Sequence, residues 1–559
     1  MLGRLFAAFR QTRPALTGAD AAQQQYTQGL VHLRDGRTRH ARASFEAAHQ
    51  LLPAAAPPLG MLGYCGWFDG ETLTARADYD RAIAVATPAE RGVLRINRLI
   101  DTLPQIALSA AQLHEERAWF LRELDALLAD PPSIADPLQE IHRTVFYLGY
   151  QGLNDCEANR KLAQLFTACA PSLAYVAPHA RPAAVNQRPV GPPGARLRIG
   201  FVSMNLHKHS VGAWYNHLVR GVLDVGRFDC TLFTYMDRVD DDLRRTAETS
   251  GQHVLLERTL EAARTQIEAA RLDVLIYTDV GMHPFPYFLA FSRLAQVQAL
   301  LVGHPCTSGI PAIDCFISNV HQDTADAETH YSERLARLPQ IPAWVKKTAP
   351  PATRMSRAAL GWDAHKRYYV CPMMLQKMHP DFDSALAEIL RRDANAEVVL
   401  FADRGHPLWQ EQLEQRFESA MPELAQRVGF RGFAPKDEFL SLLQEADCVL
   451  DPFHFSGGVT TYVALSLGVP VITLPGALFR SRMTTGIYVQ AGVADCIAQS
   501  PEHYVELALQ CAADPAWRAA QSARILDAHA RLFETDSAIE LLVDWLSKAA
   551  LPPDGNSMQ

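Results

Sequence analysis

A glycine-rich turn in the last third of the sequence carries residue types that can bind a phosphate group. An apolar run ending at Asp451 predicts a buried strand, and a helix is predicted to open at Val459. Backbone N–H groups at a helix start have no partner inside the helix, and they point with the helix dipole at an anion. The candidate anion-binding residues of this turn and helix start are Ser456, Gly457, Gly458, Thr460 and Thr461. The alternative is an ordinary turn between strand and helix, since neither G-x-G-x-x-G nor G-x-x-x-x-G-K-[ST] spacing occurs there.

Lys377 is a second candidate for the same anion. It comes directly after a predicted strand at 368–374, which opens the second series of strands and helices. A lysine in this position can neutralise a diphosphate leaving group without a metal ion. We therefore expect no metal and no other cofactor at this site. The alternative is a lysine that only faces solvent.

Polar side chains also follow two predicted strands in the middle of the chain. His209 follows the strand at 197–203, and Asp279 ends the strand at 273–279. An imidazole titrates near neutral pH, so His209 is suited to accept a proton from a substrate. The alternative is a histidine that caps a helix or faces solvent, which we expect for His207 and His217.

The elements that position these residues alternate between strands and helices in two successive series. The first has apolar runs at 197–203, 228–235, 273–279 and 297–303 and helical stretches at 211–224, 240–249 and 258–271. The second has apolar runs at 368–374, 396–403, 427–432, 446–451 and 470–475. Such alternation predicts parallel, doubly wound sheets that bind ligands at the carboxyl ends of their strands. Two consecutive α/β lobes of Rossmann-like type, without the nucleotide motifs above, are typical of a GT-B glycosyltransferase.

The N-terminal region contains an internal repeat. Five positions recur 34 residues later with the same or a similar residue, namely Gly29, Gly36, Ala41, Phe45 and Ala48 as Gly63, Gly70, Ala75, Tyr79 and Ala82. This is the tetratricopeptide (TPR) period. Two repeats are fewer than a solenoid needs, so we expect them to pack on further helices at 90–129 and 135–170. The region is predicted to be a protein-binding arm or, alternatively, a helical cap on the catalytic part.

These patterns divide the chain into four segments. Residues 1–177 are predicted as an all-α TPR-like region and 178–195, with five prolines and two glycines, as a linker. Residues 196–365 and 366–550 are predicted as the two α/β lobes, which in a GT-B enzyme are the N-terminal catalytic lobe and the C-terminal nucleotide-sugar-binding lobe. A last helix at 537–548 is predicted to return and brace the lobes.

Composition excludes several classes of partner. The net charge of −8 argues against nucleic acid or an anionic membrane surface, because both favour a basic protein. The ten cysteines form no C-x-x-C pair and no zinc-spaced cluster, which indicates reduced thiols. The run 1–9 is too short and too interrupted for a signal peptide or a membrane span. We therefore expect a cytoplasmic protein.

The stretch from Asp451 to Gly492 resembles the nucleotide-diphosphate loop and following helix of the protein O-GlcNAc transferase and SPINDLY family, especially its bacterial members with TPR repeats. The likeness continues through Thr473–Gly476 and Arg482. It implies that Lys377 is the diphosphate lysine and that His209 lies at the active site, where it has been considered a base. It also implies that a backbone group of Ala434 and the side chain of Lys436 meet the uracil base.

A segment at 303–314 resembles the family's G-Y-P-G-T-S-G run, with an Asp shortly after it. His304 replaces the aromatic residue and Cys306 the glycine. The candidate acceptor or cleft residues are His304, Pro305, Thr307, Ser308 and Asp279. Turn chemistry alone is the alternative explanation for Pro305 and Gly309.

The chain departs from the animal enzyme at four donor-site positions. Met374 stands for a glutamine, Phe439 and Val459 stand for histidines, and Ala464 stands for the aspartate that contacts the ribose. The diphosphate part of the pattern is therefore better preserved than the base and ribose part.

The resemblance implies an inverting, metal-independent GT-B hexosyltransferase that binds a nucleotide sugar and a protein acceptor. The expected reaction is transfer of GlcNAc from UDP-GlcNAc to Ser or Thr. The alternatives are a protein glycosyltransferase that uses GDP-fucose or UDP-glucose with O- or N-linkage, and a TPR scaffold whose lobes have lost activity. Calorimetry with nucleotide sugars distinguishes the inactive scaffold from the active enzymes, since an inactive scaffold need not bind a donor.

Overall fold

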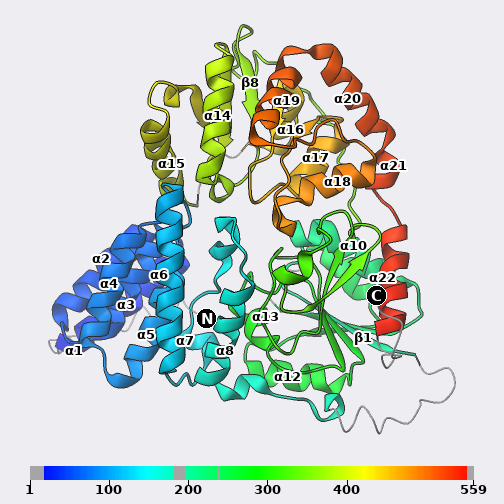
Figure 1. The fold of residues 1–559 in the computed structure, drawn as a ribbon. Coiled ribbons are helices and arrows are strands. Elements are labelled where there is room, and N and C mark those ends of the chain that lie inside the picture. The colour runs from blue at the N-terminus through cyan, green and yellow to red at the C-terminus, as the bar shows by residue number, and fades with distance from the viewer. Residues whose placement is uncertain (1–17, 182–195, 236–239, 404, 433, 550–559) are drawn as a thin grey trace, which may run out of the picture. The chain divides into compact units, whose positions relative to one another are not determined.

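The chain forms two compact units, one from Met1 to Leu103 and one from Pro104 to Gln559. The computed structural model describes residues 18–181, 196–235, 240–403, 405–432 and 434–549 (Figure 1). The division lies inside the predicted helical region 1–177, in a break that contains Pro104. Most of the predicted linker lies outside the described residues, and the predicted segment boundaries at 177, 195 and 365 stay predictions.

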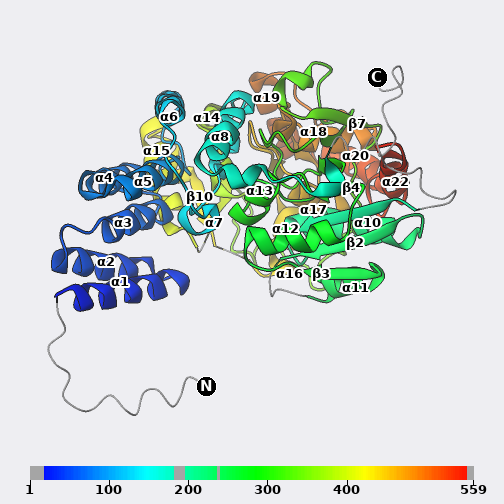
Figure 2. The same cartoon turned by 90° about the horizontal axis from the view of Figure 1, so that it is seen from below.

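The first unit is helical. Its helices are α1 (Gly18–Arg34), α2 (Thr38–Leu51), α3 (Ala56–Phe68), α4 (Thr72–Val85) and α5 (Pro88–Asp101). The predicted repeat maps onto the pairs α1–α2 and α3–α4, which lie side by side in Figure 2. Gly36 and Gly70, one repeat apart, form the tight turns inside the two pairs with φ of 71° and 79°. These positive angles explain why glycine occupies both positions.

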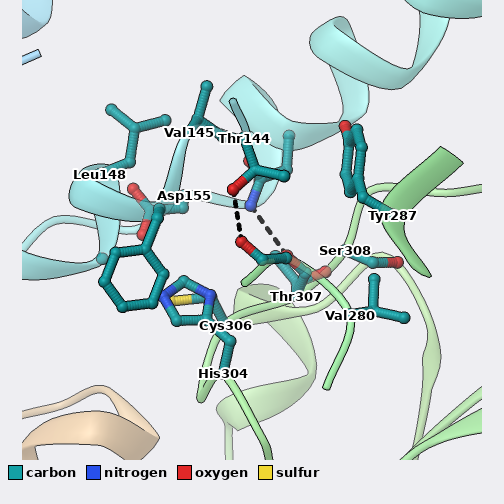
Figure 3. A pocket seen from close by; sticks show the side chains of 14 residues that line it. Thr144, Val145, Leu148, Asp155, Val280, Tyr287, His304, Cys306, Thr307 and Ser308 are labelled. Carbon is teal, nitrogen blue, oxygen red and sulfur yellow. Dashed lines mark hydrogen bonds between the residues drawn. The ribbon is translucent and has the colours of Figure 1, made fainter. Parts of the chain in front are cut away.

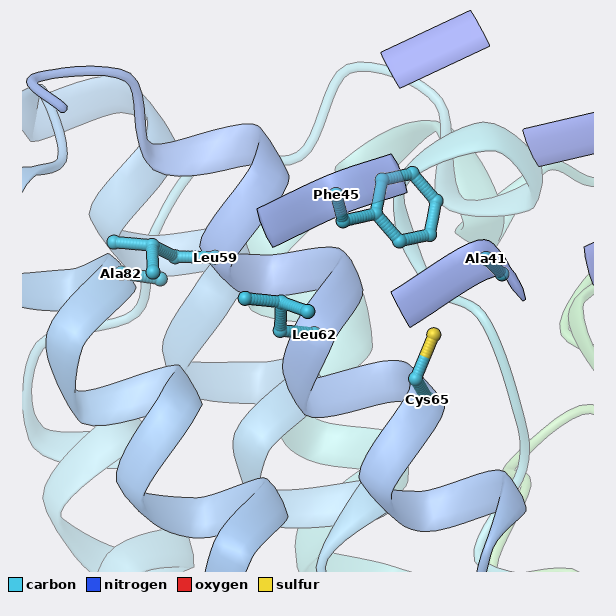
Figure 4. Packing of buried hydrophobic residues seen from close by; sticks show 6 residues of the cluster. All are labelled: Ala41, Phe45, Leu59, Leu62, Cys65 and Ala82. Carbon is cyan, nitrogen blue, oxygen red and sulfur yellow. The ribbon is translucent and has the colours of Figure 1, made fainter. Parts of the chain in front are cut away.

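Close helix approach in each pair depends on a second repeated glycine. A Cβ atom on Gly29 would lie 2.5 Å from the ring of Phe45, and one on Gly63 would lie 2.5 Å from the ring of Tyr79. Figure 4 shows the core between the pairs, formed by Ala41, Phe45, Leu59, Leu62, Cys65 and Ala82. The first unit is therefore TPR-like in packing as well as in period.

The second unit begins with further helices. These are α6 (Ala110–Ala129), α7 (Pro137–Glu140), the 3₁₀ turn η1 (Phe146–Gln151) and α8 (Cys156–Cys169), followed by the 3₁₀ turns η2 (Pro171–Ala174) and η3 (Pro178–Ala180). The expected helix at 135–170 is thus interrupted. Residues 141–145 belong to no helix or strand, and the Thr144 hydroxyl donates a 2.6 Å hydrogen bond to the carbonyl oxygen of Gly281. The tertiary contact replaces helical pairing in this segment.

The first lobe is a seven-stranded sheet with the order β3-β2-β1-β4-β5-β6-β7, in which all neighbours are parallel. Its strands are β1 (Arg198–Ser203), β2 (Asp229–Thr234), β3 (Gln252–Leu255), β4 (Val274–Tyr277), β5 (Val297–Leu300), β6 (Cys315–Asn319) and β7 (Arg334–Leu338). Its helices are α10 (Ser210–Asp224), α11 (Asp241–Thr249), α12 (Leu260–Ala269) and α13 (Pro284–Leu289), with the 3₁₀ turn η4 (Ala327–His330). The strand order reverses between β1 and β4, and ligands of such sheets bind where this happens.

The second lobe is a five-stranded parallel sheet with the order β10-β9-β8-β11-β12. Its strands are β8 (Arg367–Val370), β9 (Ala396–Phe401), β10 (Val428–Arg431), β11 (Cys448–Leu450) and β12 (Val471–Ile472). Its helices up to the glycine turn are α14 (Pro380–Arg392), α15 (Pro407–Ala420) and α16 (Lys436–Glu445). Those from the glycine turn onward are α17 (Val459–Ser466), α18 (Met483–Ala491), α19 (Pro501–Ala513), α20 (Pro515–Asp527) and α21 (His529–Leu532). The 3₁₀ turns are η5 (Leu375–Lys377), η6 (Ala425–Arg427) and η7 (Phe479–Ser481). Here the order reverses between β8 and β11, the strands that precede Lys377 and the glycine turn.

The last helix, α22 (Ser537–Ala549), returns to the first lobe as predicted. Figure 1 shows it beside α10, where Ile539 packs so closely that a Cβ on Gly221 would lie 2.2 Å from its side chain. Two parallel α/β lobes after an all-α region make this a GT-B fold. No helix among the described residues is both long enough and apolar enough to cross a bilayer.

Candidate active site

A cavity of about 950 Å³ lies between the two lobes of the second unit. Loops at the carboxyl ends of strands in both sheets line it. The first lobe contributes Lys208, His209, Ser210, Val211, Trp214, Met282, Val302, Gly303, His304 and Pro305. The second contributes Pro372, Met373, Met374, Lys377, Phe401, Ala402, Asp403, Ala434, Lys436, Phe439, Phe455, Gly458, Val459, Thr460 and Met483. Phe146 and Tyr150 complete the wall. The cavity is therefore at the two points where strand order reverses.

Lys377 lies on the cavity wall immediately after β8. Its Nζ donates a 2.9 Å hydrogen bond to the carbonyl oxygen of Ser456 and lies 4.6 Å from the centroid of the Phe455 ring. Burial lowers the pKa of Lys377 to about 8, and the Asp451 carboxylate opposes this shift. The lysine is thus still mainly charged at pH 7, in partly desolvated surroundings where its charge acts strongly on an anion.

The glycine turn is held by contacts behind the cavity wall. The Gly457 amide donates to Asp451 Oδ1 at 2.7 Å, and the Thr473 hydroxyl donates to Asp451 Oδ2 at 2.7 Å. Asp451 is fully buried, and burial raises its pKa to about 6 against these hydrogen bonds. A Cβ on Gly457 would lie 2.3 Å from Met373 Cε. Asp451 thereby fixes the shape of the turn.

Of the predicted donor-binding residues in this turn, Gly458 and Thr460 line the cavity, but Ser456, Gly457 and Thr461 do not. Thr461 is fully buried, and its hydroxyl pairs with the hydroxyl of Thr484 at 2.8 Å. The structure thus places Ser456, Gly457 and Thr461 behind the wall, because their polar groups complete the turn itself. The helix start of α17 remains directed at the cavity through Gly458 and Thr460.

Trp214 of the first lobe meets the glycine turn of the second. A Cβ on Gly458 would lie 3.0 Å from Trp214 Cζ2, and the Trp214 ring stands perpendicular to the Tyr462 ring at 6.0 Å. The buried indole N–H of Trp214 has no acceptor among the described residues. Trp214 was not predicted as a site residue. Its place after β1, on the first turns of α10, was the signal available in the sequence.

His209 both lines the cavity and caps α10. Its Nδ1 accepts the Val211 amide at 3.2 Å, so in the neutral ring of this state the proton is on Nε2. Burial, and to a smaller extent His207, lowers the pKa of His209. The ring is therefore neutral at pH 7. The structure gives this residue the capping role that was the alternative in the sequence, together with a position at the cavity.

The other predicted residues of the first lobe divide between the cavity wall and the interior. His304 and Pro305 line the cavity, and burial followed by the charge of Arg480 lowers the pKa of His304 to about 3. Thr307 and Ser308 do not line it. They face a smaller cavity of about 30 Å³ near Thr144 (Figure 3).

Thr307 and Ser308 are held by a buried carboxylate. The Thr307 hydroxyl donates to Glu333 Oε2 at 2.6 Å, and the Ser308 amide donates to Glu333 Oε1 at 2.8 Å. These bonds fix the loop that carries His304 and Pro305. Thr307 and Ser308 were predicted to line the cleft, and the structure places them where they position the loop of His304 and Pro305.

Asp279 is also buried away from the cavity. It accepts the Met204 amide at 2.9 Å and the Asn205 side-chain amide at 2.8 Å. Burial raises its pKa to about 6, against these hydrogen bonds. Asp279 therefore shapes the loop between β1 and His209.

The two residues predicted to contact the base, Ala434 and Lys436, line the cavity together with Asp403. The rings of Phe401 and Phe439 lie 5.6 Å apart at an angle of 73°. Phe401 and Asp403 were missed, although both lie at the carboxyl end of the strand predicted at 396–403.

Three of the four residues that differ from the animal enzyme line the cavity, and the fourth does not. Met374, Phe439 and Val459 line the cavity. Ala464 is fully buried within α17, so no carboxylate is available there for a ribose. Among the described residues that line the cavity, Asp403 carries the one carboxylate. Such a lining does not resemble the oxygen-rich sites that hold Mg²⁺ or Mn²⁺.

Comparison with known proteins agrees with this geometry. Residues 356–541 match the model of glycosyl transferase family 41. The SPINDLY protein of Petunia hybrida, described as a probable UDP-N-acetylglucosamine–peptide N-acetylglucosaminyltransferase, is 22% identical over 58% of this chain and 35% of its own length. The SEC protein of Arabidopsis thaliana, with the same description, is 25% identical over 57% of this chain and 33% of its own.

The chain spans about a third of the length of these two relatives. A solved structure of an O-GlcNAc transferase mutant from Thermobaculum terrenum superposes with a TM-score of 0.67 at 22% identity, over 96% of this chain and 98% of that one. This likeness confirms the fold. The family match over residues 356–541 and the SPINDLY and SEC relatives show that this chain is similar to the protein O-GlcNAc transferase and SPINDLY glycosyltransferases.

Proposed function

We propose that this protein transfers GlcNAc from UDP-GlcNAc to a Ser or Thr hydroxyl of a protein, with inversion and without a metal ion. The observation that carries the proposal is the meeting of Lys377 with the helix start at Gly458 and Thr460 on one cavity wall. An ammonium group and oriented N–H dipoles together are suited to a diphosphate. The family relationship supplies the reaction class.

The proposed reaction is a single displacement. The acceptor oxygen forms a bond to the anomeric carbon on the face opposite the diphosphate, while the bond from that carbon to the diphosphate oxygen breaks. Negative charge builds up on the departing nucleoside diphosphate, and Lys377 and the α17 helix start stabilise it. These groups are already in place before the substrate arrives, as the Lys377 contact with Ser456 shows. Metal chemistry is not needed for this step.

The acceptor proton has two candidate destinations. His209 can take it only if its Nε2 carries a lone pair, which requires the neutral ring to move its own proton to Nδ1 and release the Val211 amide. We assign His209 this role of base. If the cap persists throughout the reaction, a phosphate oxygen of the donor receives the proton instead.

We propose that the end of the cavity lined by Ala434 and Lys436 holds uracil, with these two residues as its polar contacts.

We further propose that the TPR-like unit holds the acceptor protein, since stacked helix pairs present extended surfaces for this purpose. Nine of the ten free cysteines are buried, which fits a reducing compartment, and we place the reaction in the cytoplasm.

The test is a donor panel. The purified protein is incubated with cell extract and isotopically labelled UDP-GlcNAc, UDP-glucose or GDP-fucose, and modified peptides are located by mass spectrometry. Label from UDP-GlcNAc on Ser or Thr is the expected result, and the Lys377→Ala variant is the control. Label only from another donor, or on Asn, contradicts the proposed donor or linkage. Absence of donor binding in calorimetry supports the inactive scaffold.

A further inference from the structure

A cluster of metal-ligating side chains lies next to the proposed donor site but outside it. His379 and Asp381 begin helix α14, and His454 comes from the loop after β11. Their ligand atoms all lie within 4.8 Å of one another. His454 Nε2 is 2.8 Å from Asp381 Oδ2, and His379 Nδ1 is 3.5 Å from the same oxygen. None of the three is among the residues that line the donor cavity.

His379 is held in the tautomer that a metal ligand needs. Its Nδ1 accepts the Asp381 amide at 3.2 Å, and its ring also hydrogen-bonds to the backbone of Gln151. A backbone carbonyl can only accept, so the proton is on Nε2 and Nδ1 is unprotonated. The one lone pair of Nδ1 accepts the Asp381 amide in this state, and a metal ion bound at Nδ1 would replace that hydrogen bond. Imidazoles that bind metals usually have such a second hydrogen bond, which fixes the tautomer and the ring orientation.

His454 occupies an unusual backbone conformation that directs its ring toward this point. Its φ is 68°, a value that non-glycine residues rarely adopt. The ring packs against Gly152, where a Cβ would lie 2.8 Å from His454 Cγ. The His379 and His454 rings are 4.2 Å apart and steeply inclined, at 63°. The fold thus maintains a strained residue so that two imidazoles and a carboxylate converge.

We propose that His379, Asp381 and His454 form a binding site for a divalent transition metal ion of the Zn²⁺ type. Two imidazoles and one carboxylate suit such an ion and leave a coordination position for water. Mg²⁺ and Ca²⁺ prefer oxygen ligands, so they are expected to bind weakly.

The ion would join the two loops that carry the proposed diphosphate site. Lys377 precedes His379 by two residues, and Phe455 follows His454 directly. Binding there therefore stabilises the arrangement of these loops and does not require contact with the nucleotide sugar. The site is independent of the proposed donor chemistry.

The test is calorimetric titration of ZnCl₂ into the full chain, after treatment with a chelator and its removal. His379→Asn and His454→Asn are suitable variants. Asn is a good helix N-cap and also tolerates positive φ, so both variants keep their local backbone. His365→Asn, which removes an exposed imidazole, is the matched control. Each cluster variant is expected to weaken Zn²⁺ binding by at least about tenfold, the scale seen when even a supporting residue of a metal site is lost.

A second measurement covers the case in which one variant folds poorly. ZnCl₂ should raise the thermal unfolding midpoint of the parent and of His365→Asn, but not of Asp381→Asn, and MgCl₂ should have little effect on any of them. Zn²⁺ binding that is absent from the parent, or unchanged in all three cluster variants, would overturn the proposal. In that case His379 is only a helix cap and His454 only the partner of Asp381.

Discussion

The Nζ atom of Lys377 donates a 2.9 Å hydrogen bond to the backbone carbonyl of Ser456. This bond connects the loop after β8 to the glycine turn after β11, the two strands between which the sheet order reverses. The lysine charge is therefore fixed beside the start of α17 before any ligand binds. A preformed site of this kind avoids the entropy loss of ordering a free lysine.

The first prediction concerns pH. Burial lowers the pKa of Lys377 to about 8 from 10.5, and a bound diphosphate will raise it again. UDP binding should therefore take up a proton above pH 8. UDP affinity should be highest below pH 8 and should fall as pH rises through that value, by up to about tenfold per unit.

Calorimetry of UDP between pH 7 and 9, in buffers with different ionisation enthalpies, measures this proton uptake. The Lys377→Arg variant should show none, because arginine does not titrate in this range. An affinity of the parent protein that does not change between pH 7 and 9 contradicts the assignment.

The second prediction separates the two roles of His209. The His209→Asn variant keeps a side-chain acceptor for the α10 cap, whereas His209→Ala removes it. If His209 acts on the acceptor proton, both variants should lose about 10² or more in kcat while the donor Kd stays within a few-fold. Normal turnover by His209→Asn together with a defect in His209→Ala means that the residue is only a cap.

The third prediction tests the contact between the lobes. In Gly458→Ala the new methyl group would lie 3.0 Å from Trp214, a ring also packed against Tyr462. Over-packing of this kind costs about 1–3 kcal/mol of folding stability. Because Gly458 lines the cavity, the shift of the turn that relieves the contact should also weaken UDP binding.

Gly429→Ala is the matched control, because a Cβ there would meet only a carbonyl oxygen at 3.9 Å. Equal UDP affinity in the two glycine variants would show that Trp214 does not constrain the turn.

The fourth prediction concerns metal ions. Asp403 is the one carboxylate among the described residues that line the cavity, so UDP binding and sugar transfer should persist in excess EDTA. A requirement for Mn²⁺ or Mg²⁺ in transfer assays is the contrary result. EDTA would also empty the proposed Zn²⁺ site, whose ligands do not line the cavity. Loss of that ion should lower the thermal unfolding midpoint without abolishing sugar transfer.

Much of the architecture could be predicted because the pattern of apolar residues is strong. The continuous runs that form β1, β2, β4 and β9 are buried on both faces and have few other interpretations. The edge strand β3 was missed because its four residues Gln252–Leu255 are mostly exposed. The strand β7 (RLARL) was missed because two of its five residues are arginines and only Leu338 is buried.

The candidate site was predictable at the level of loops but not of single side chains. Thr460 and Thr461 are adjacent hydroxyl residues in the sequence, yet only Thr460 lines the cavity. The difference is a rotation of about 100° between neighbouring helical residues, which follows from helix geometry. The contact of Trp214 with Gly458 could not be predicted, because the two residues are far apart in the sequence. The sequence predicts Asp451 only as the end of a strand, and the hydrogen bond that it accepts from the Gly457 amide is seen only in the structure.

The central claim is that Lys377 and the α17 helix start bind the diphosphate of a nucleotide-sugar donor. The most direct measurement is calorimetric titration of UDP into the parent protein, Lys377→Ala and the control Lys366→Ala. Lys366 lies just before β8, the strand that Lys377 follows. Its Nζ lies 3.4 Å from Glu397 Oε1. A charge-assisted contact contributes about 1.5–3 kcal/mol, so Lys377→Ala should bind UDP at least about tenfold more weakly while Lys366→Ala binds normally. Unchanged UDP affinity in Lys377→Ala would contradict the account.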